Sequence, residues 1–276
     1  MELTLPVTLA VLGAALLHAA WNALLKSSAD KQLDTVAISV GAGLVGVAVA
    51  AWLPFPAREA WPWLAASAAV HILYFLLLAG AYQWGELSYA YPIMRGGGPV
   101  IVALAGTAVF GEVLGPGQWL GVALVCAGIV AFAYGKHDRR ATLFAVGNAV
   151  VIAAYTLIDG KGVRLSGSPV AYVMWFFAAN AVAVYAYAGL RRGAEVPRYL
   201  LRNWPRIFIG AVFTTGSYGI ALWAMTQAPV ALVAVLRETA VLFGALVGAL
   251  FLGEKMTRRK LVATGAVLTG LVVLKL

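Results

Sequence analysis

Long apolar runs alternate with short polar turns along the whole chain. A helix needs about 20 apolar residues to cross the hydrocarbon core of a bilayer, and ten runs of roughly this length are present. Open strands are excluded at that depth because lipid gives unpaired backbone groups no partner. The pattern therefore predicts ten transmembrane helices, at residues 4–25, 35–53, 61–84, 88–110, 117–134, 141–158, 169–190, 204–226, 229–252 and 258–275.

The second half of the chain repeats the first at a shift of 142 residues. The matched positions are Gly111-Glu112 with Gly253-Glu254, Arg95 with Arg237, and Gly128 with Gly270. Each half holds five predicted helices, and an odd number means that the two halves insert with opposite orientation. We therefore expect an all-α integral membrane protein of two inverted five-helix repeats around a central cavity, with the first repeat at 1–136 and the second at 137–276.

The composition agrees with a single membrane domain. Hydrophobic residues make up 62% of the chain and charged residues only 11%, whereas a soluble domain is about a quarter charged. The lone cysteine, Cys126, lies within a predicted span, which excludes internal disulfides and thiolate metal clusters. The first residues lack a basic segment, so the first apolar run is expected to be a retained helix and not a cleaved signal peptide.

The basic residues report orientation. A net charge of +9 would suggest nucleic acid in a soluble protein, but here most Lys and Arg residues lie in short loops between spans. Fourteen follow the odd-numbered helices and four lie on the opposite side. Because basic loops stay in the cytoplasm, this distribution predicts both termini outside it, and no nucleic-acid partner.

Arg95 and Arg237 lie inside predicted spans, where a lipid-facing charge costs a few kcal/mol or more. Both should therefore face the protein interior or water. The guanidinium group suits a carboxylate or a phosphate; the alternatives are snorkelling to a headgroup and an internal ion pair with Glu238. Arg95 is expected nearer the cavity because three glycines follow it, and Arg237 to be structural because Glu238 adjoins it.

The fourth predicted helix contains two prolines and three glycines, which weaken a helix. A helix broken at mid-depth exposes backbone groups to a ligand, whereas small residues also permit close helix packing. Both interpretations remain open. The candidate hinge residues are Pro92, Gly96, Gly97, Gly98 and Pro99.

Polar and aromatic residues within the spans form a candidate substrate site. His18 and Asn22 share one face of the first helix, and His71 and Tyr74 lie together on the third. The two histidines are candidates for proton coupling because histidine titrates near neutral pH; the alternative is an ordinary hydrogen-bonded core histidine. The candidate substrate-binding residues are His18, Trp21, Asn22, His71, Tyr74, Tyr91, Arg95, Tyr155, Trp175 and Tyr218.

Enzyme and cofactor signatures are missing from the sequence. There is no Walker loop, no Ser-His-Asp or HExxH arrangement, and the Gly96-Gly97-Gly98 run does not follow a strand. No carboxylate stands at metal-ligand spacing beside either histidine of the candidate site. We therefore expect no catalytic activity, no cofactor and no metal.

The segment R-G-G-G-P-V-I-V-A-L-A at 95–105, with the Phe-Gly-Glu at 110–112 and Q-W-L-G-V-A-L-V-C-A-G at 118–128, resembles the drug/metabolite transporter superfamily, EamA type. A second copy runs from Arg237 to Gly270. The resemblance implies a secondary transporter of the bacterial inner membrane that works by alternating access. The small four-helix exporters of this superfamily carry a membrane-embedded Glu eight residues before a Lys. Here that place, counted from Lys26, holds His18, so a cavity for zwitterions or anions is expected in place of a cation site.

Ten-helix relatives include amino-acid exporters, and the aromatic interior favours that branch, including the YddG-like aromatic amino-acid exporters. The alternatives are a drug or cation carrier, a nucleotide-sugar carrier and, in another class, a channel or membrane scaffold. The expected partners are a small-molecule substrate and membrane lipid, with protons as the candidate coupling ion, and the expected state is a monomer. Many relatives are thought to keep both termini in the cytoplasm, opposite to the basic-residue count.

The basic-residue count gives a test of topology. If both termini face the periplasm, a fluorescent protein fused after Leu276 should stay dark, because it folds to its fluorescent form only in the cytoplasm. Fluorescence of intact cells is the measurement. Bright cells would overturn this orientation and restore the one usual among relatives.

Overall fold

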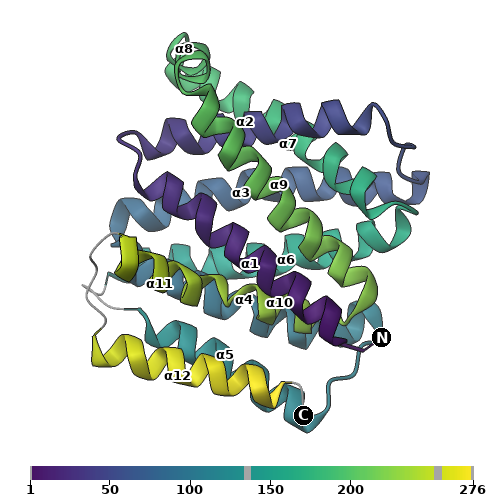
Figure 1. Ribbon diagram of the computed structural model, residues 1–276, viewed down its shortest axis with the longest axis vertical. Coiled ribbons are helices and arrows are strands. Elements are labelled where there is room, and N and C mark those ends of the chain that lie inside the picture. Colours follow the sequence, from purple (N-terminus) through teal and green to yellow (C-terminus); the bar gives the residue numbers. More distant parts are fainter. Residues whose placement is uncertain (1, 134–137, 252–256, 275–276) are drawn as a thin grey trace.

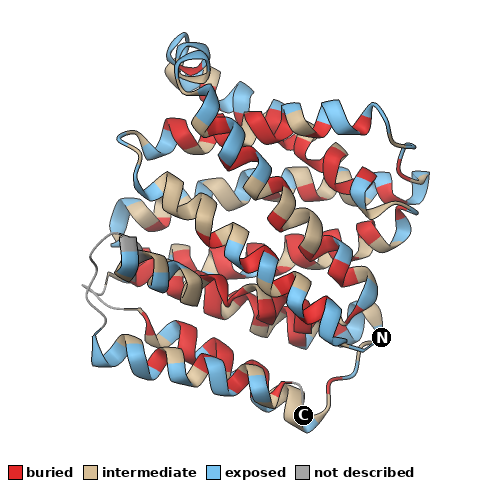
Figure 2. Ribbon diagram, viewed as in Figure 1, coloured by how far each residue is buried: buried red, intermediate tan, exposed pale blue. Residues whose placement is uncertain are grey.

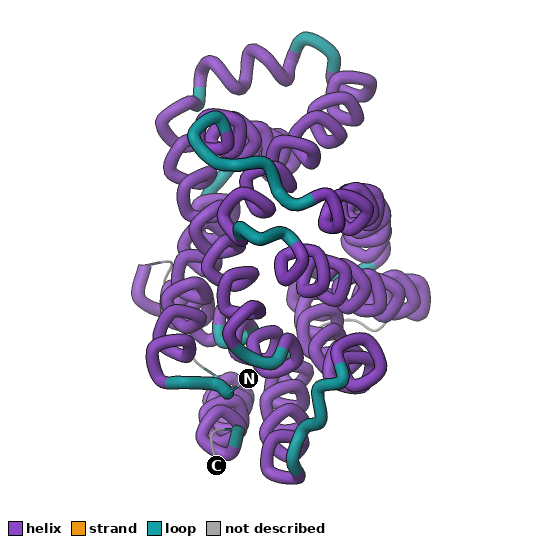
Figure 3. The backbone as a smooth tube through the Cα atoms, turned by 90° about the vertical axis from the view of Figure 1, so that its right-hand side faces the viewer, coloured by secondary structure: helices purple, strands orange, loops and turns teal. Residues whose placement is uncertain are grey.

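The computed structural model describes residues 2–133, 138–251 and 257–274, and within them every regular element is a helix (Figure 3). The elements are α1 Leu5–Lys26, α2 Lys31–Ala50, the 3₁₀ turn η1 Arg58–Ala60, α3 Trp61–Trp84, α4 Leu87–Phe110, α5 Pro116–Ala131, α6 Arg139–Leu165, α7 Pro169–Arg192, α8 Glu195–Arg202, α9 Trp204–Gln227, α10 Val230–Arg237, α11 Ala240–Phe251 and α12 Arg258–Val273.

The expected all-helical membrane fold is confirmed. Eight segments of the described chain are long and apolar enough to cross a bilayer. The last of them, Val230–Val247, joins α10 to part of α11. The helices α5 and α12, with 16 residues each, are shorter and pack on each other. Two details differ from the sequence prediction: the ninth span is divided into two helices, and the loop expected at 191–203 forms the short helix α8.

The helix contacts follow the two repeats. Helix α1 packs on α9, and its counterpart α6 packs on α3; α2 packs on α7, and α5 on α12. When each helix is replaced by its counterpart in the other half, the α1–α9 contact becomes the α6–α3 contact, and the α2–α7 and α5–α12 contacts are unchanged. Helices α1 and α6 run in opposite directions along the bundle, and the start of α1 lies at the same end as the end of α12 (Figure 1). The arrangement is an inverted repeat.

Local sequence signals set the helix ends. Pro lies in the first turn of α1, α3, α5, α7 and α9, where its missing N–H is not needed. The side chains of Asp30, Asp138 and Ser168 accept hydrogen bonds from the first backbone N–H groups of α2, α6 and α7. Gly111 ends α4 with a positive φ of 68°, a conformation that glycine adopts without strain.

An ion-pair cluster ties the two halves together at the basic end of the bundle. Arg206, near the start of α9, places its Nε 2.8 Å from Oδ2 of Asp34, which is fully buried on α2. The same guanidinium donates to the carbonyl oxygen of Leu24 and to the hydroxyl of Ser27. Tyr199 of α8 donates to the Asp34 carboxylate at 3.2 Å. These contacts hold α1, α2, α8 and α9 together.

A second cluster ties the halves at the opposite end. Arg164, in the last turn of α6, places Nη2 2.7 Å from Oε1 of Glu112, in the loop between α4 and α5. Arg164 also donates to the carbonyl oxygens of Met225 and Ala228, at 2.7 and 3.1 Å. The other Glu112 oxygen accepts from the N–H of Val230, the first residue of α10. A carboxylate is favoured at a helix N-terminus, which explains the Glu of the first Gly-Glu motif.

Small residues let the helices approach closely, and the buried positions follow the faces that meet (Figure 2). A Cβ added to Gly270 of α12 would lie 2.8 Å from the backbone nitrogen of Val125 on α5, and one added to Gly128 of α5 would lie 2.8 Å from Cγ2 of Val267 on α12. The two contacts are equivalent, because the repeat shift places Gly128 on Gly270 and Val125 on Val267. Close approach of this kind is a main source of helix association in lipid.

We expect Gly270→Ala to destabilise the protein, because the new methyl group meets the backbone of α5, which cannot move aside cheaply. Overpacking of this kind costs about 1–3 kcal/mol. The measurement is the temperature at which the detergent-solubilised protein loses its monodisperse peak. Gly265→Ala is the matched control, since nothing lies within 4 Å of a Cβ at that position on the same helix. Equal melting temperatures for the two variants would show that the α5–α12 contact is not close-packed.

Candidate functional site

The ninth predicted span is interrupted near its middle. Helix α10 ends at Arg237 and α11 begins at Ala240. Between them, the N–H groups of Glu238 and Thr239 donate to carbonyls three residues back, both at 3.1 Å, where an α-helix would use carbonyls four residues back. The carbonyl of Ala234 therefore loses its regular helical donor beside the central pocket. A discontinuous span with released backbone groups is typical of transporter binding sites.

A break in the fourth span, one of the two interpretations of its prolines and glycines, is not observed. Helix α4 is continuous from Leu87 to Phe110 and contains both Pro92 and Pro99. The repeat shift places Glu238, at the observed break, on Gly96 of α4. The interruption therefore occurs at the equivalent place in the other repeat.

The glycines of α4 serve close packing. A Cβ on Gly96 would lie 3.0 Å from the carbonyl oxygen of Cys126 on α5. One on Gly98 would lie 2.9 Å from Cγ2 of Ile152 on α6, and Gly97 faces the same helix. Of the two interpretations of these residues, the geometry is that of helix contact.

An ion pair joins the two repeats beside the break. Arg95 of α4 places its Nε 2.8 Å from Oε2 of Glu238, and both side chains are more than nine-tenths buried. Among the described residues, neither of these two atoms has a further hydrogen-bond partner. Arg237, which the sequence suggests as the partner of Glu238, instead places its guanidinium carbon 5.3 Å from the centre of the Tyr218 ring. Arg95 thus has a fixed counter-charge, whereas the contact described for Arg237 is with an aromatic face.

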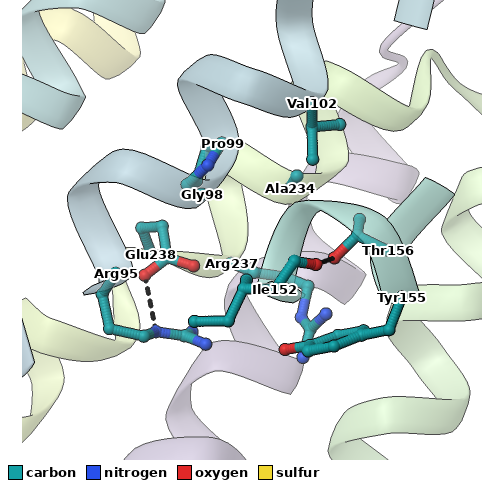
Figure 4. A pocket seen from close by; sticks show the side chains of 10 residues that line it. All are labelled: Arg95, Gly98, Pro99, Val102, Ile152, Tyr155, Thr156, Ala234, Arg237 and Glu238. Atoms are coloured by element: carbon teal, nitrogen blue, oxygen red, sulfur yellow. Dashed lines mark hydrogen bonds and ion pairs between the residues drawn. The ribbon is translucent and has the colours of Figure 1, made fainter. Parts of the chain in front are cut away.

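These residues line a small pocket between the repeats (Figure 4). Its cavity volume of about 10 Å³ is no more than one water molecule needs. The pocket is therefore too small for a metabolite, which could bind there only after the helices move apart. The lining residues are Arg95, Gly98, Pro99, Val102, Ile152, Tyr155, Thr156, Ala234, Arg237 and Glu238.

Aromatic rings cluster next to this pocket. The buried ring of His71 on α3 lies 4.4 Å from that of Tyr155 and 4.8 Å from that of Phe176, measured between centroids. Tyr218 lies 5.2 Å from Phe176, and Tyr74 lies 5.9 Å from Tyr155. The structure thus brings together four predicted site residues, His71, Tyr74, Tyr155 and Tyr218, and adds Phe176. Tyr155 also lines the pocket, so the cluster of rings adjoins it.

The sequence analysis missed a buried carboxyl group at this place. Asp159 of α6 is fully buried. Its Oδ1 accepts a hydrogen bond of 2.9 Å from the hydroxyl of Tyr172, and its Oδ2 accepts from the hydroxyl of Tyr218. The sequence pattern ends the sixth span at residue 158 and so places Asp159 in a loop, whereas α6 continues to Leu165. An acid directly after a long uncharged run is the signal that could have found it.

The predicted residues of α1 form a local group at the edge of the site. The Trp21 indole N–H lies 3.3 Å from Nδ1 of His18, and the Asn22 side chain donates to the His18 carbonyl of its own helix. His18 is half-buried and lies within electrostatic reach of Arg95 and Arg237. His18 therefore lies towards Arg95 and Arg237, whereas the side chain of Asn22 is hydrogen-bonded to the backbone of its own helix.

Two more predicted aromatics have different surroundings. Tyr91 packs in one apolar cluster with Tyr74 and Tyr155, close to Arg95. Trp175 stacks on Phe55 of the α2–α3 loop, 5.1 Å between ring centres, and the described ring contacts do not connect it to His71. The structure therefore brings Tyr91 into the site and leaves Trp175 outside it.

The chemistry of the site is that of a binding pocket. Within residues 2–133, 138–251 and 257–274, no group of three or more His, Cys, Asp or Glu side chains could hold a metal ion. The pocket has two guanidinium groups, one carboxylate and the ring of Tyr155, all at the boundary between the repeats. The other aromatic rings lie next to it. Such a set can hold a small ligand that carries both charges and an apolar part.

Comparison with known proteins gives the family. The model of the EamA-like transporter family matches twice, at residues 5–134 and 139–276. A solved crystal structure is similar over 97% of this chain and 94% of its own, with a TM-score of 0.72 and 16% sequence identity, which shows a shared fold. A curated, uncharacterised protein of Sinorhizobium fredii is 43% identical over 60 residues, which are 22% of this chain and 51% of that protein; the chain thus spans about half of its length.

The two family matches lie on the two helical repeats, and the shared fold extends over nearly all of the chain. The chain belongs to the EamA-like transporter family and is a multi-pass membrane transporter of the drug/metabolite type.

Proposed function

We propose that this transporter carries small zwitterionic metabolites, and most of all neutral or aromatic amino acids, out of the cell across the inner membrane of a bacterium. The observation that carries the proposal is the pocket between α4, α6 and α10. It has positive and negative groups side by side, next to the cluster of aromatic rings. An amino acid presents the same three features: a carboxylate, an ammonium group and, in the aromatic ones, a ring.

The two arginines divide their roles in this proposal. Arg95 is neutralised by Glu238 at 2.8 Å and is nearly inaccessible. Arg237 is only half-buried and forms no ion pair in the described part of the chain. A substrate carboxylate therefore binds Arg237, since its charge is available, and the substrate ammonium group lies towards Glu238. Tyr155 and Tyr218 pack against the side chain of the substrate.

The small size of the pocket and the two end clusters support alternating access. The halves are joined at one end by Arg206 and Asp34, and at the other by Arg164 and Glu112. Both clusters are formed and the pocket has room for about one water molecule, so the structure fits an occluded state. Opening towards one side requires that the cluster on that side separates while the other holds.

A nucleotide-sugar carrier is the second candidate, because two arginines could hold a diphosphate. Glu238 opposes this interpretation, since its carboxylate would repel a phosphate next to Arg95. The candidate of another class is a channel. A channel differs from a carrier in the kinetics of its flux and not in amino-acid composition.

The test is counterflow in proteoliposomes that contain the purified protein. Labelled L-phenylalanine and L-leucine should exchange against the same unlabelled amino acid with saturation, because each transport cycle must bind one substrate. UDP-glucose and tetraphenylphosphonium serve as probes for the nucleotide-sugar and cation alternatives. Saturable flux of only one of those two probes would replace the proposed substrate class, and flux that never saturates would indicate a channel.

Arg237→Gln should raise the KM for L-phenylalanine by about ten- to a hundredfold. A hydrogen bond to a charged group is worth about 1.5–3 kcal/mol, and each 1.4 kcal/mol is a factor of about ten. Initial rates of counterflow at matched protein density give the KM. Arg202→Gln, at the exposed end of α8, removes the same charge far from the pocket and should leave the KM unchanged. An unaltered KM in Arg237→Gln would remove this residue from the substrate site.

A further inference from the structure

Three of the four carboxyl groups that are largely buried in the described bundle have an arginine partner. Arginine does not lose its proton in proteins, so each of these three carboxylates has a permanent counter-charge. The pairs are Asp34 with Arg206, Glu112 with Arg164, and Glu238 with Arg95, at nitrogen–oxygen distances of 2.8, 2.7 and 2.8 Å.

The fourth carboxyl group, that of Asp159, has no arginine or lysine partner among the described residues. Hydroxyl groups of Tyr172 and Tyr218 bind its two oxygens. The basic side chain that faces it is His71, whose Nδ1 lies 2.9 Å from the Ser67 carbonyl oxygen of its own helix. A buried carboxylate without a fixed counter-charge is costly. Its charge can be removed by one proton on the carboxyl group or balanced by one proton on the imidazole.

The other groups around Asp159 do not supply a fixed counter-charge. Ser67 and His71 face it from α3, Tyr172 from α7 and Tyr218 from α9, while Tyr155 lies one turn earlier on α6 itself. The neighbouring charges on α4 and α10 are Arg95, which is paired with Glu238, and Arg237, which lies over the Tyr218 ring. On η1, which packs on the same helix, Arg58 and Glu59 are exposed.

We propose that Asp159 and His71 form a proton-binding site, and that this site couples transport to a proton gradient. The carboxyl group takes up a proton when the site is open to one side of the membrane and releases it when the site is open to the other. Tyr218 connects this site to the pocket, since its hydroxyl binds Asp159 and its ring lies under Arg237. A carboxylate that binds Arg237 draws the cation away from the ring and so disturbs the donor of Asp159. This coupling step rests on the proposed function; proton binding itself does not.

The proton site is tested without any substrate. Infrared difference spectra of the reconstituted full-length protein, recorded from acid to alkaline pH, report protonated carboxyl groups by their C=O stretch. Wild type should show a buried carboxyl band that is present at acid pH and lost on alkalinisation, and Asp159→Asn should lack it. The Glu238→Gln variant, which removes another buried carboxylate, is the matched control and should keep the band. A band that persists in Asp159→Asn, or a wild type without a titrating band at any pH, would overturn the site.

Coupling is tested with L-phenylalanine as the probe. One pH unit can drive a concentration ratio of up to about tenfold for each proton coupled. An imposed gradient should therefore change the steady-state level in wild-type proteoliposomes by up to about that factor. Asp159→Asn should exchange labelled for unlabelled substrate and reach the same level with and without the gradient. A response equal to that of wild type would exclude coupling through Asp159.

The two experiments separate two kinds of failure. If L-phenylalanine is not carried at all, the proposed substrate class is wrong, while the infrared titration still decides whether Asp159 binds a proton. If transport occurs and no carboxyl band titrates, the substrate class stands and the proton site falls.

Discussion

The bilayer offers no water to a buried charge, so every ionised group in this bundle must find its partner inside the protein. The pair between Arg95 and Glu238 is the central case. Each residue comes from a different repeat, and each would be an expensive charge alone. Their contact places α4 against the break between α10 and α11, and the pocket forms around it. The end clusters of Arg206 and Arg164 obey the same constraint at the two faces. The packing of the halves is thus organised by where charges can be paired.

The sequence was sufficient for the spans, the repeat and the helical class, because these depend on local hydrophobicity and on residue identity at a fixed shift. It was insufficient to predict which side chains pair with each other. Glu238 adjoins Arg237 in the chain, yet successive helical residues point in different directions, and the acid pairs with Arg95 of the other repeat. The proline and glycine content of α4 left a helix break and close packing both open, whereas the structure shows close packing of Gly96 and Gly98 in a continuous helix. Asp159 was missed because a hydropathy boundary stops at the first charge, even where the helix continues in the interior.

The two repeats differ at positions that line the pocket. Where α4 has Gly96, its counterpart in the second half is Glu238, and only the second half is interrupted there. Exchange of the halves preserves the main contacts of α1 with α9, α3 with α6, α2 with α7 and α5 with α12, but not the pocket chemistry. A symmetric scaffold can present the same pathway to both sides of a membrane, and asymmetric residues at its centre allow a ligand to be held in one orientation.

The contact between α5 and α12 has the form of an interface between identical subunits. Gly128 meets Val267 and Gly270 meets Val125, so each helix offers the same small residue to the same partner residue of the other. Isologous dimers about a two-fold axis make contacts of this kind. This contact within one chain therefore has the geometry of a subunit interface. A change in the size of one glycine affects only one of the two equivalent contacts and so breaks the symmetry. In a dimer of identical subunits, the same substitution would affect both contacts.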